Sequence, residues 1–212
     1  MDLEELYFQS SQWLRRALFV NENNPEALYL LSKLHESGYS VDRSIERAIT
    51  YLERASRQGY AVALTKLAHY YYSGYSDENF RFPVNKSKAI EYYRVAMDKG
   101  DAEAANCLGL IYEQWPEGVL CDIQEQEQRL SKALECYQMA IDSSERDDAL
   151  FNKGLLLVSL QQNEEGVSLI TRASVKGNLR AKEYLIMANM YEDSQVYRGA
   201  VHSSFISNDS IA

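Results

Sequence analysis

A twelve-residue segment recurs five times and constrains the fold of this chain more than any other feature. The copies begin at Ser10, Ala48, Ala89, Ala133 and Gly166. Every copy has Ala at its eighth place, and all but one have a large aromatic or apolar residue at the fourth. Successive copies start 33 to 44 residues apart, which is the period of helix-pair repeats. We therefore expect an all-α chain whose helix pairs stack in sequence.

A second motif lies between these copies and predicts the partner helix of each pair. An Ala opens it and a small residue follows five places later, where two helix backbones can approach closely. The opening residues are Ala27, Ala63, Ala104 and Ala149, and the small residues are Ser32, Ala68, Gly109 and Gly154. Gly59, Gly100 and Gly177 are the last residues of three recurring segments and are typical of a left-handed helix cap.

Together the two motifs resemble the SEL-one-like repeat family, a relative of the tetratricopeptide repeat with a longer loop inside each helix pair. The resemblance covers about residues 24–177. It implies an α-solenoid, a right-handed superhelix of about five antiparallel helix pairs. We expect one repeat domain over residues 1–192, comprising a half-repeat (2–21), repeats at about 24–59, 60–100, 101–145 and 146–177, and a capping helix (178–192). Residues 193–212 should form a flexible tail.

The family geometry implies that the first helix of each pair lines a concave groove. Residues two, five, nine and twelve of that helix would then face a partner. The candidates are Tyr29, Lys33, Glu36, Thr65, His69, Tyr72, Asn106, Leu110, Glu113, Phe151 and Leu155. Tyr29, Tyr72 and Phe151 are the expected anchors, because aromatic residues carry much of the energy of binding. Each residue alone could be an ordinary exposed side chain, so the hypothesis depends on the set.

The resemblance favours a protein-protein interaction adaptor or scaffold that binds a protein or peptide through this groove. The alternative is a regulatory or immunity-type inhibitor that occludes an enzyme or toxin. Catalysis is the weakest reading, because His35, His69 and His202 lie far apart and no nucleophile or phosphate-binding motif is present. We expect no catalytic residue, cofactor or metal, and we expect His35 to be a core residue.

Charge further limits the partners. The chain has 31 acidic and 22 basic residues, a net charge of −9, which is the wrong sign for nucleic acid. Residues 119–148 carry eight acids and three bases; they could form a solvated face or dock a partner with a basic patch. The acidic start lacks a signal sequence, and three cysteines without a CxxC pair fit a reducing compartment. We expect a cytoplasmic protein without a membrane span, whose oligomeric state the sequence leaves open.

Several local features have two interpretations. The polar run within residues 116–130 could extend the following helix or form an arm that contacts a partner. Phe80 and Phe82 should fold their loop back onto its own repeat, and Trp13 should fill the packing position of Tyr51 and Tyr92. Residues 4–10 resemble a protease site used to remove tags, but their apolar spacing continues as a helix into the first recurring segment.

Overall fold

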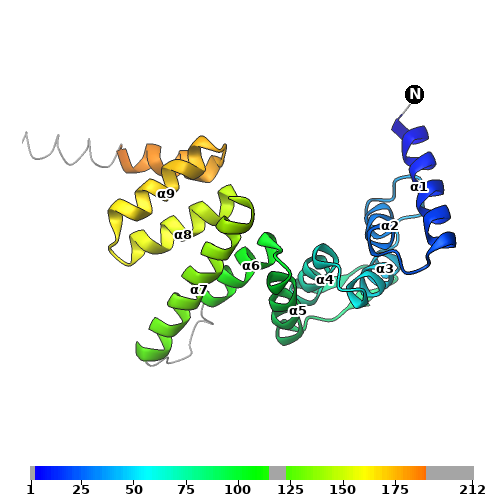
Figure 1. The fold of residues 1–212 in the computed structure, drawn as a ribbon, viewed down its shortest axis with the longest axis horizontal. Helices are drawn as coiled ribbons and strands as arrows, with labels where there is room; N and C mark the ends of the chain where they lie inside the picture. The colour runs from blue at the N-terminus through cyan, green and yellow to red at the C-terminus, as the bar shows by residue number, and fades with distance from the viewer. Residues whose placement is uncertain (1–2, 115–122, 190–212) are drawn as a thin grey trace, which may run out of the picture. The chain divides into compact units, whose positions relative to one another are not determined.

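The computed structural model describes residues 3–114 and 123–189 and is almost entirely helical in that part of the chain (Figure 1). The predicted all-α class is confirmed. The chain divides into two compact units, Met1–Ser144 and Glu145–Ala212. The expectation of one domain over residues 1–192 stays a prediction, and the expected tail at 193–212 lies outside the described residues.

The first unit consists of α-helices joined by short connections and one hairpin. Its helices are α1 (Leu3–Val20), α2 (Pro25–Ser37), α3 (Ile45–Arg57), α4 (Ala61–Ser73), α5 (Lys86–Asp98), α6 (Ala102–Glu113) and α7 (Ile123–Ser144). They pack as the pairs α2–α3, α4–α5 and α6–α7, and α1 packs against α2. The second motif therefore forms the first helix of each pair, and the recurring segment forms the second.

The second unit repeats the same construction on a smaller scale. Helix α8 (Asp147–Ser159) pairs with α9 (Asn163–Val175). Residues 179–189 form a further helix. Asn178 caps its start, because its side chain accepts a hydrogen bond from the backbone N–H of Ala181 at 2.9 Å. Ala181 is completely buried.

Capping residues fix where most helices of the first unit begin. The side chains of Asn24, Ser44, Asn85 and Asp101 each accept a hydrogen bond from the backbone N–H three residues later, at 2.8 to 3.3 Å. Such caps satisfy N–H groups that have no partner inside the helix. Gly38 ends α2 in the left-handed conformation, with φ of 80°, as residues at this position often do.

Small residues bring the paired helices together as the motifs predict. Ala68 and Ala96 are completely buried. A β-carbon added to Gly154 would lie 2.8 Å from the carbonyl oxygen of Gly166, so the backbones of α8 and α9 touch there. Gly109 likewise makes room for the ring of Tyr137 on α7. Interior packing is dense, so these positions limit side-chain size strictly.

The loop between α4 and α5 contains a hairpin that sequence reasoning did not foresee. Strands β1 (Tyr75–Ser76) and β2 (Arg81–Phe82) pair antiparallel. The carboxylate of Asp77 closes the turn by accepting hydrogen bonds from the backbone N–H groups of Asn79 and Phe80. The ring of Phe82 lies 4.8 Å from that of Tyr71, which confirms that this loop packs back onto its own repeat.

The described part of the polar insertion forms a helix extension. Residues 123–130 form the first two turns of α7, and residues 124–128 are exposed. The Arg129 guanidinium donates hydrogen bonds to the backbone carbonyls of Tyr112 and Glu113, which lie at the end of α6. Residues 115–122 lie outside the described part of the chain.

One packing prediction is wrong and one is confirmed. Trp13 is 66% exposed, because the described residues place no first helix against the indole. His35 is buried as expected; its Nδ1 lies 3.1 Å from the carbonyl oxygen of Asp42, and its ring stacks on Tyr51.

Candidate functional site

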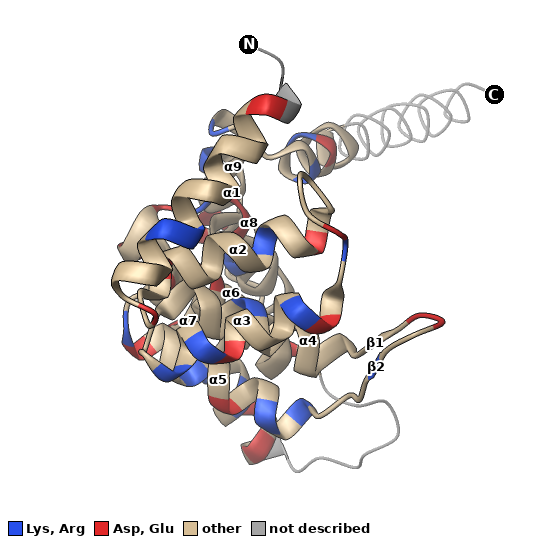
Figure 2. Cartoon of the chain, turned by 90° about the vertical axis from the view of Figure 1, so that its right-hand side faces the viewer, with Lys and Arg blue, Asp and Glu red and all other residues tan. Residues whose placement is uncertain are grey.

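The first helices α2, α4 and α6 lie side by side in the first unit and together form one face. Side-chain contacts join each to the next: Glu36 of α2 reaches Lys66 of α4 at 3.0 Å, and His69 of α4 reaches Glu103 of α6 at 3.1 Å. Figure 2 shows charged residues of both signs on the helices of this unit. Side-chain contacts therefore link α2 to α4 and α4 to α6.

The contact between α2 and α4 is centred on Glu36. Its Oε1 accepts a hydrogen bond from the hydroxyl of Tyr70 at 2.8 Å, in addition to the ion pair with Lys66. Burial and this hydrogen bond raise the pKa of Tyr70 well above its usual value, so its hydroxyl remains a donor. Nearby, the ring of Tyr29 lies 5.6 Å from that of Tyr60.

The contact between α4 and α6 is centred on His69. Its Nε2 lies 3.1 Å from a carboxylate oxygen of Glu103, and its Nδ1 lies 2.8 Å from the hydroxyl of Tyr93. A neutral imidazole with its proton on Nε2 satisfies both contacts, since it donates to the carboxylate and accepts from the phenol. Both ring nitrogens are thus engaged, which fixes the orientation of a half-exposed ring.

A small cavity of about 180 Å³ opens beside His69. Tyr72 of α4 and Leu110 of α6 line it, and Tyr93, Cys107, Ile111 and Gln114 complete the wall. Tyr72 and Leu110 are both half-buried. Here an aromatic, an aliphatic and an imidazole group therefore come together beside one small cavity.

Three predicted groove residues are buried instead. Thr65, Asn106 and Phe151 are 3%, 5% and 4% exposed. Thr65 donates a hydrogen bond to the carboxylate of Asp101 on the next repeat, and the guanidinium of Arg180 covers the ring of Phe151. All three are the fifth residue of a first helix. In these contacts that position faces the following helix and not an open groove, so these residues cannot act as surface anchors.

The remaining candidates differ in how they are held. Lys33 is exposed and its Nζ lies 5.9 Å from the centre of the Tyr29 ring. The carboxylate of Glu113 accepts a hydrogen bond from the buried hydroxyl of Tyr137 at 2.6 Å, so it ties α6 to α7. Leu155 is half-buried on α8, which belongs to the second unit.

Sequence reasoning overlooked the residues that join successive first helices. Lys66 forms an ion pair, and Tyr70 and Asp101 form hydrogen bonds, with residues of the neighbouring first helix. None of the three is among the residues predicted from helix spacing. Asp101 had a recognisable signal, because an Asp directly before a helix is a common cap. Lys66 and Tyr70 had none, since their role depends on which residue the neighbouring repeat places opposite them.

Other site classes find little support among the described residues. Residues 3–114 and 123–189 contain no group of three or more His, Cys, Asp or Glu side chains placed to hold a metal ion. No helix within these ranges combines the length and apolar character needed to cross a membrane. Cys136 is buried, and burial raises the pKa of its thiol to about 11, so that thiol is a poor nucleophile at neutral pH.

Comparison with known proteins supports the repeat assignment. The Sel1 repeat family matches residues 25–60, 61–101 and 128–144. Two similar solved structures are a protective antigen of uropathogenic Escherichia coli with an SLR fold (19% identity, TM-score 0.66) and a Sel1 repeat protein from Oxalobacter formigenes (22% identity, TM-score 0.65). Each match covers 82% of this chain, but only 35% and 66% of those two chains. No curated protein matches the sequence.

Proposed function

This chain contains Sel1 repeats, and we propose that it is an adaptor or scaffold that holds a protein or peptide on the face formed by α2, α4 and α6. Stacked helix pairs create extended surfaces suited to holding another protein. The observation that carries the proposal is the cluster of His69, Tyr72 and Leu110 around the 180 Å³ cavity.

The cluster is held in place before any partner arrives. Hydrogen bonds to Tyr93 and Glu103 fix the ring of His69, and the Nζ of Lys86 lies 5.5 Å from the centre of the Tyr72 ring. A surface whose side chains are already ordered loses less conformational entropy on binding. Tyr72 can supply a large contact area and a hydroxyl from one residue, which suits an anchor.

Acidic residues outnumber basic ones on the three first helices, where Glu26, Glu36, Glu103 and Glu113 stand against Lys33 and Lys66, and this excess favours a basic partner. Glu26 and Glu103 are exposed at the second position of α2 and α6, and the whole chain carries a net charge of −9. Complementary charge accelerates encounter and excludes partners of the wrong sign. We therefore propose a partner segment that combines an apolar or aromatic side chain with nearby Lys or Arg.

The proposal is tested with the Tyr72→Ala/Leu110→Ala variant. Affinity purification from the native host and mass spectrometry identify the partner, and titration calorimetry measures its binding. We expect the double variant to weaken binding at least about tenfold, because a few central residues carry most of the energy. Met139→Ala is the matched control, since Met139 is 43% exposed on the second helix α7. Equal binding by the folded double variant and the wild type would contradict the proposal.

The same purified complex separates the two modes of action. A scaffold should hold two different proteins at once, so a second partner should join the first complex in size-exclusion chromatography. An inhibitor should form a one-to-one complex in which the partner loses its own activity. The adaptor reading fails if only the second result is obtained.

A further inference from the structure

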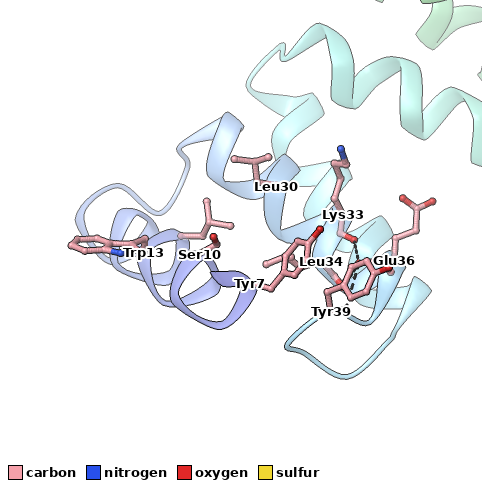
Figure 3. Close-up of a pocket in the computed structure, with 10 residues that line it drawn as sticks. Tyr7, Ser10, Trp13, Leu30, Lys33, Leu34, Glu36 and Tyr39 are labelled. Atoms are coloured by element: carbon pink, nitrogen blue, oxygen red, sulfur yellow. Dashed lines mark hydrogen bonds between the residues drawn. The ribbon is translucent and has the colours of Figure 1, made fainter. Parts of the chain in front are cut away.

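Among the described residues, α1 has the pattern of a second helix and no first helix pairs with it. Helix α1 contains the earliest copy of the recurring segment, which forms the second helix in every later repeat. A cavity of about 710 Å³ lies between α1 and α2 (Figure 3). Its apolar lining includes Tyr7, Trp13, Leu14, Leu30 and Leu34, and Lys33 lies at the same site. Figure 3 shows Tyr7, Leu34 and Tyr39 close together, with Trp13 farther along α1.

Repeat positions identify what this cavity is shaped to hold. In register, Leu30, Lys33 and Leu34 of α2 correspond to Cys107, Leu110 and Ile111 of α6. Those α6 residues face His69 and Tyr72 of the preceding first helix, α4, around the 180 Å³ cavity. Leu14 of α1 corresponds to Tyr93 of α5, which lines the same small cavity. The large cavity therefore occupies the place where a first helix would pack.

The last described helix of the second unit, residues 179–189, has the pattern of a first helix. No second helix follows it among the described residues. In residues 179–189, Ala181 occupies the position of Ala149 in α8, and both are completely buried. Leu179, Ile186 and Met187 are nevertheless 70%, 59% and 71% exposed. Spacings of seven and eight residues place these three side chains on one helix face. An exposed apolar stripe of this kind marks a contact surface.

The exposed stripe matches the cavity position by position. Met187 corresponds to His69, so in a completed pair it would enter between Leu14, Leu30 and Leu34. Ile186 corresponds to Gly109, which lies against the bulky Tyr137. Leu14 of α1 corresponds to Tyr137 of α7 and is smaller than tyrosine. A completed pair would therefore have room for Ile186, which is larger than the corresponding Gly109.

We propose that the helix of residues 179–189 docks into the α1–α2 cavity of a second copy of this chain. The two half-repeats would complete one helix pair and bury Met187 and Ile186 against α1 and α2. Because the two contacting surfaces differ, the contact is head-to-tail and generates chains or closed rings. This self-association does not require the partner proposed above, although the cavity includes Lys33 and Glu36 of α2, which also belong to the partner face.

Sedimentation velocity of the full chain over about a hundredfold concentration range tests the proposal. The wild type should increase in weight-average mass with concentration. Met187→Glu and Leu30→Glu should each weaken association at least about tenfold, because each would move a carboxylate from water into a mostly apolar contact. Val175→Glu and Phe19→Glu are matched controls, since these residues are 84% and 93% exposed and neither lines the cavity; both should associate like the wild type.

Mixing the two impaired variants distinguishes a head-to-tail contact from a symmetric one. Leu30→Glu keeps an intact helix and Met187→Glu keeps an intact cavity, so an equimolar mixture should form dimers and nothing larger. A mixture that stays monomeric would overturn the proposal, as would a wild type that is monomeric throughout or variants that associate normally. Circular dichroism measures whether each variant is folded. If Leu30→Glu is unfolded, Trp13→Glu replaces it, because Trp13 lines the cavity and is 66% exposed.

Discussion

At the residue scale, buried tyrosines hold the helices of the first unit together. Tyr93 and Tyr137 are 2% and 0% exposed, and their hydroxyls contact His69 and Glu113. Burial raises the pKa of both phenols far above the usual value. Each ring supplies apolar area and each hydroxyl finds a partner, which is the condition for burying Tyr without cost.

These tyrosines predict a loss of stability in alkali. Because their pKa values are raised in the folded state, the unfolded chain loses these protons first. The stabilisation is complete below about pH 10 and declines as pH rises above it. Urea unfolding followed by circular dichroism at several pH values should show this decline. Tyr137→Phe should make the decline of the unfolding free energy with pH shallower. Tyr39→Phe should leave the decline unchanged, because Tyr39 is 55% exposed. A free energy of unfolding that is constant up to pH 11 would contradict the prediction.

At the scale of the element, caps and loops decide how each helix pair begins and closes. Asp101 caps α6 through the backbone N–H of Ala104 and also accepts the hydroxyl hydrogen bond of Thr65 on α4. Asn85 caps α5, and its own backbone N–H donates to the carbonyl oxygen of Tyr71 at 2.7 Å. One residue thus sets a helix boundary and fixes the neighbouring helix against it.

Asp101→Ala should lower the free energy of unfolding by about 2 kcal/mol, since it removes a cap and leaves the buried Thr65 hydroxyl with one partner fewer. Asp101→Asn retains an acceptor oxygen and should lose less than half as much. Chemical denaturation of the three proteins measures the differences. Similar losses for the two variants would show that the charge, and not the two hydrogen bonds, stabilises this junction.

At the scale of the whole molecule, the helices pack locally and the contacts divide into two compact units. Within the first unit, each helix pair contacts mainly its neighbours in sequence. In such chains stability is close to a sum of repeat terms and nearest-neighbour terms. A local defect should therefore remain local and should not unfold the chain as a whole.

Gly154→Ala tests this directly, because the added methyl group would collide with Ile170 and the backbone of Gly166. We expect a loss of about 1 to 3 kcal/mol from overpacking. Hydrogen exchange measured by mass spectrometry should accelerate in α8 and α9 and remain unchanged in α2 and α3. Ser168→Ala, on the exposed face of α9, is the control. Uniform acceleration throughout the chain would instead indicate a single cooperative unit.

The sequence by itself determined the helix pairs, because their motifs encode local requirements. Small residues such as Ala96 and Gly154 are needed wherever two backbones touch, and Asn and Asp caps mark the helix starts. Only the tertiary structure decided which side chains remain accessible. Phe151 is covered by Arg180, whereas no first helix among the described residues covers Trp13. Exposure depends on what the neighbouring repeat places opposite a residue, and a periodic pattern within one helix does not contain that information.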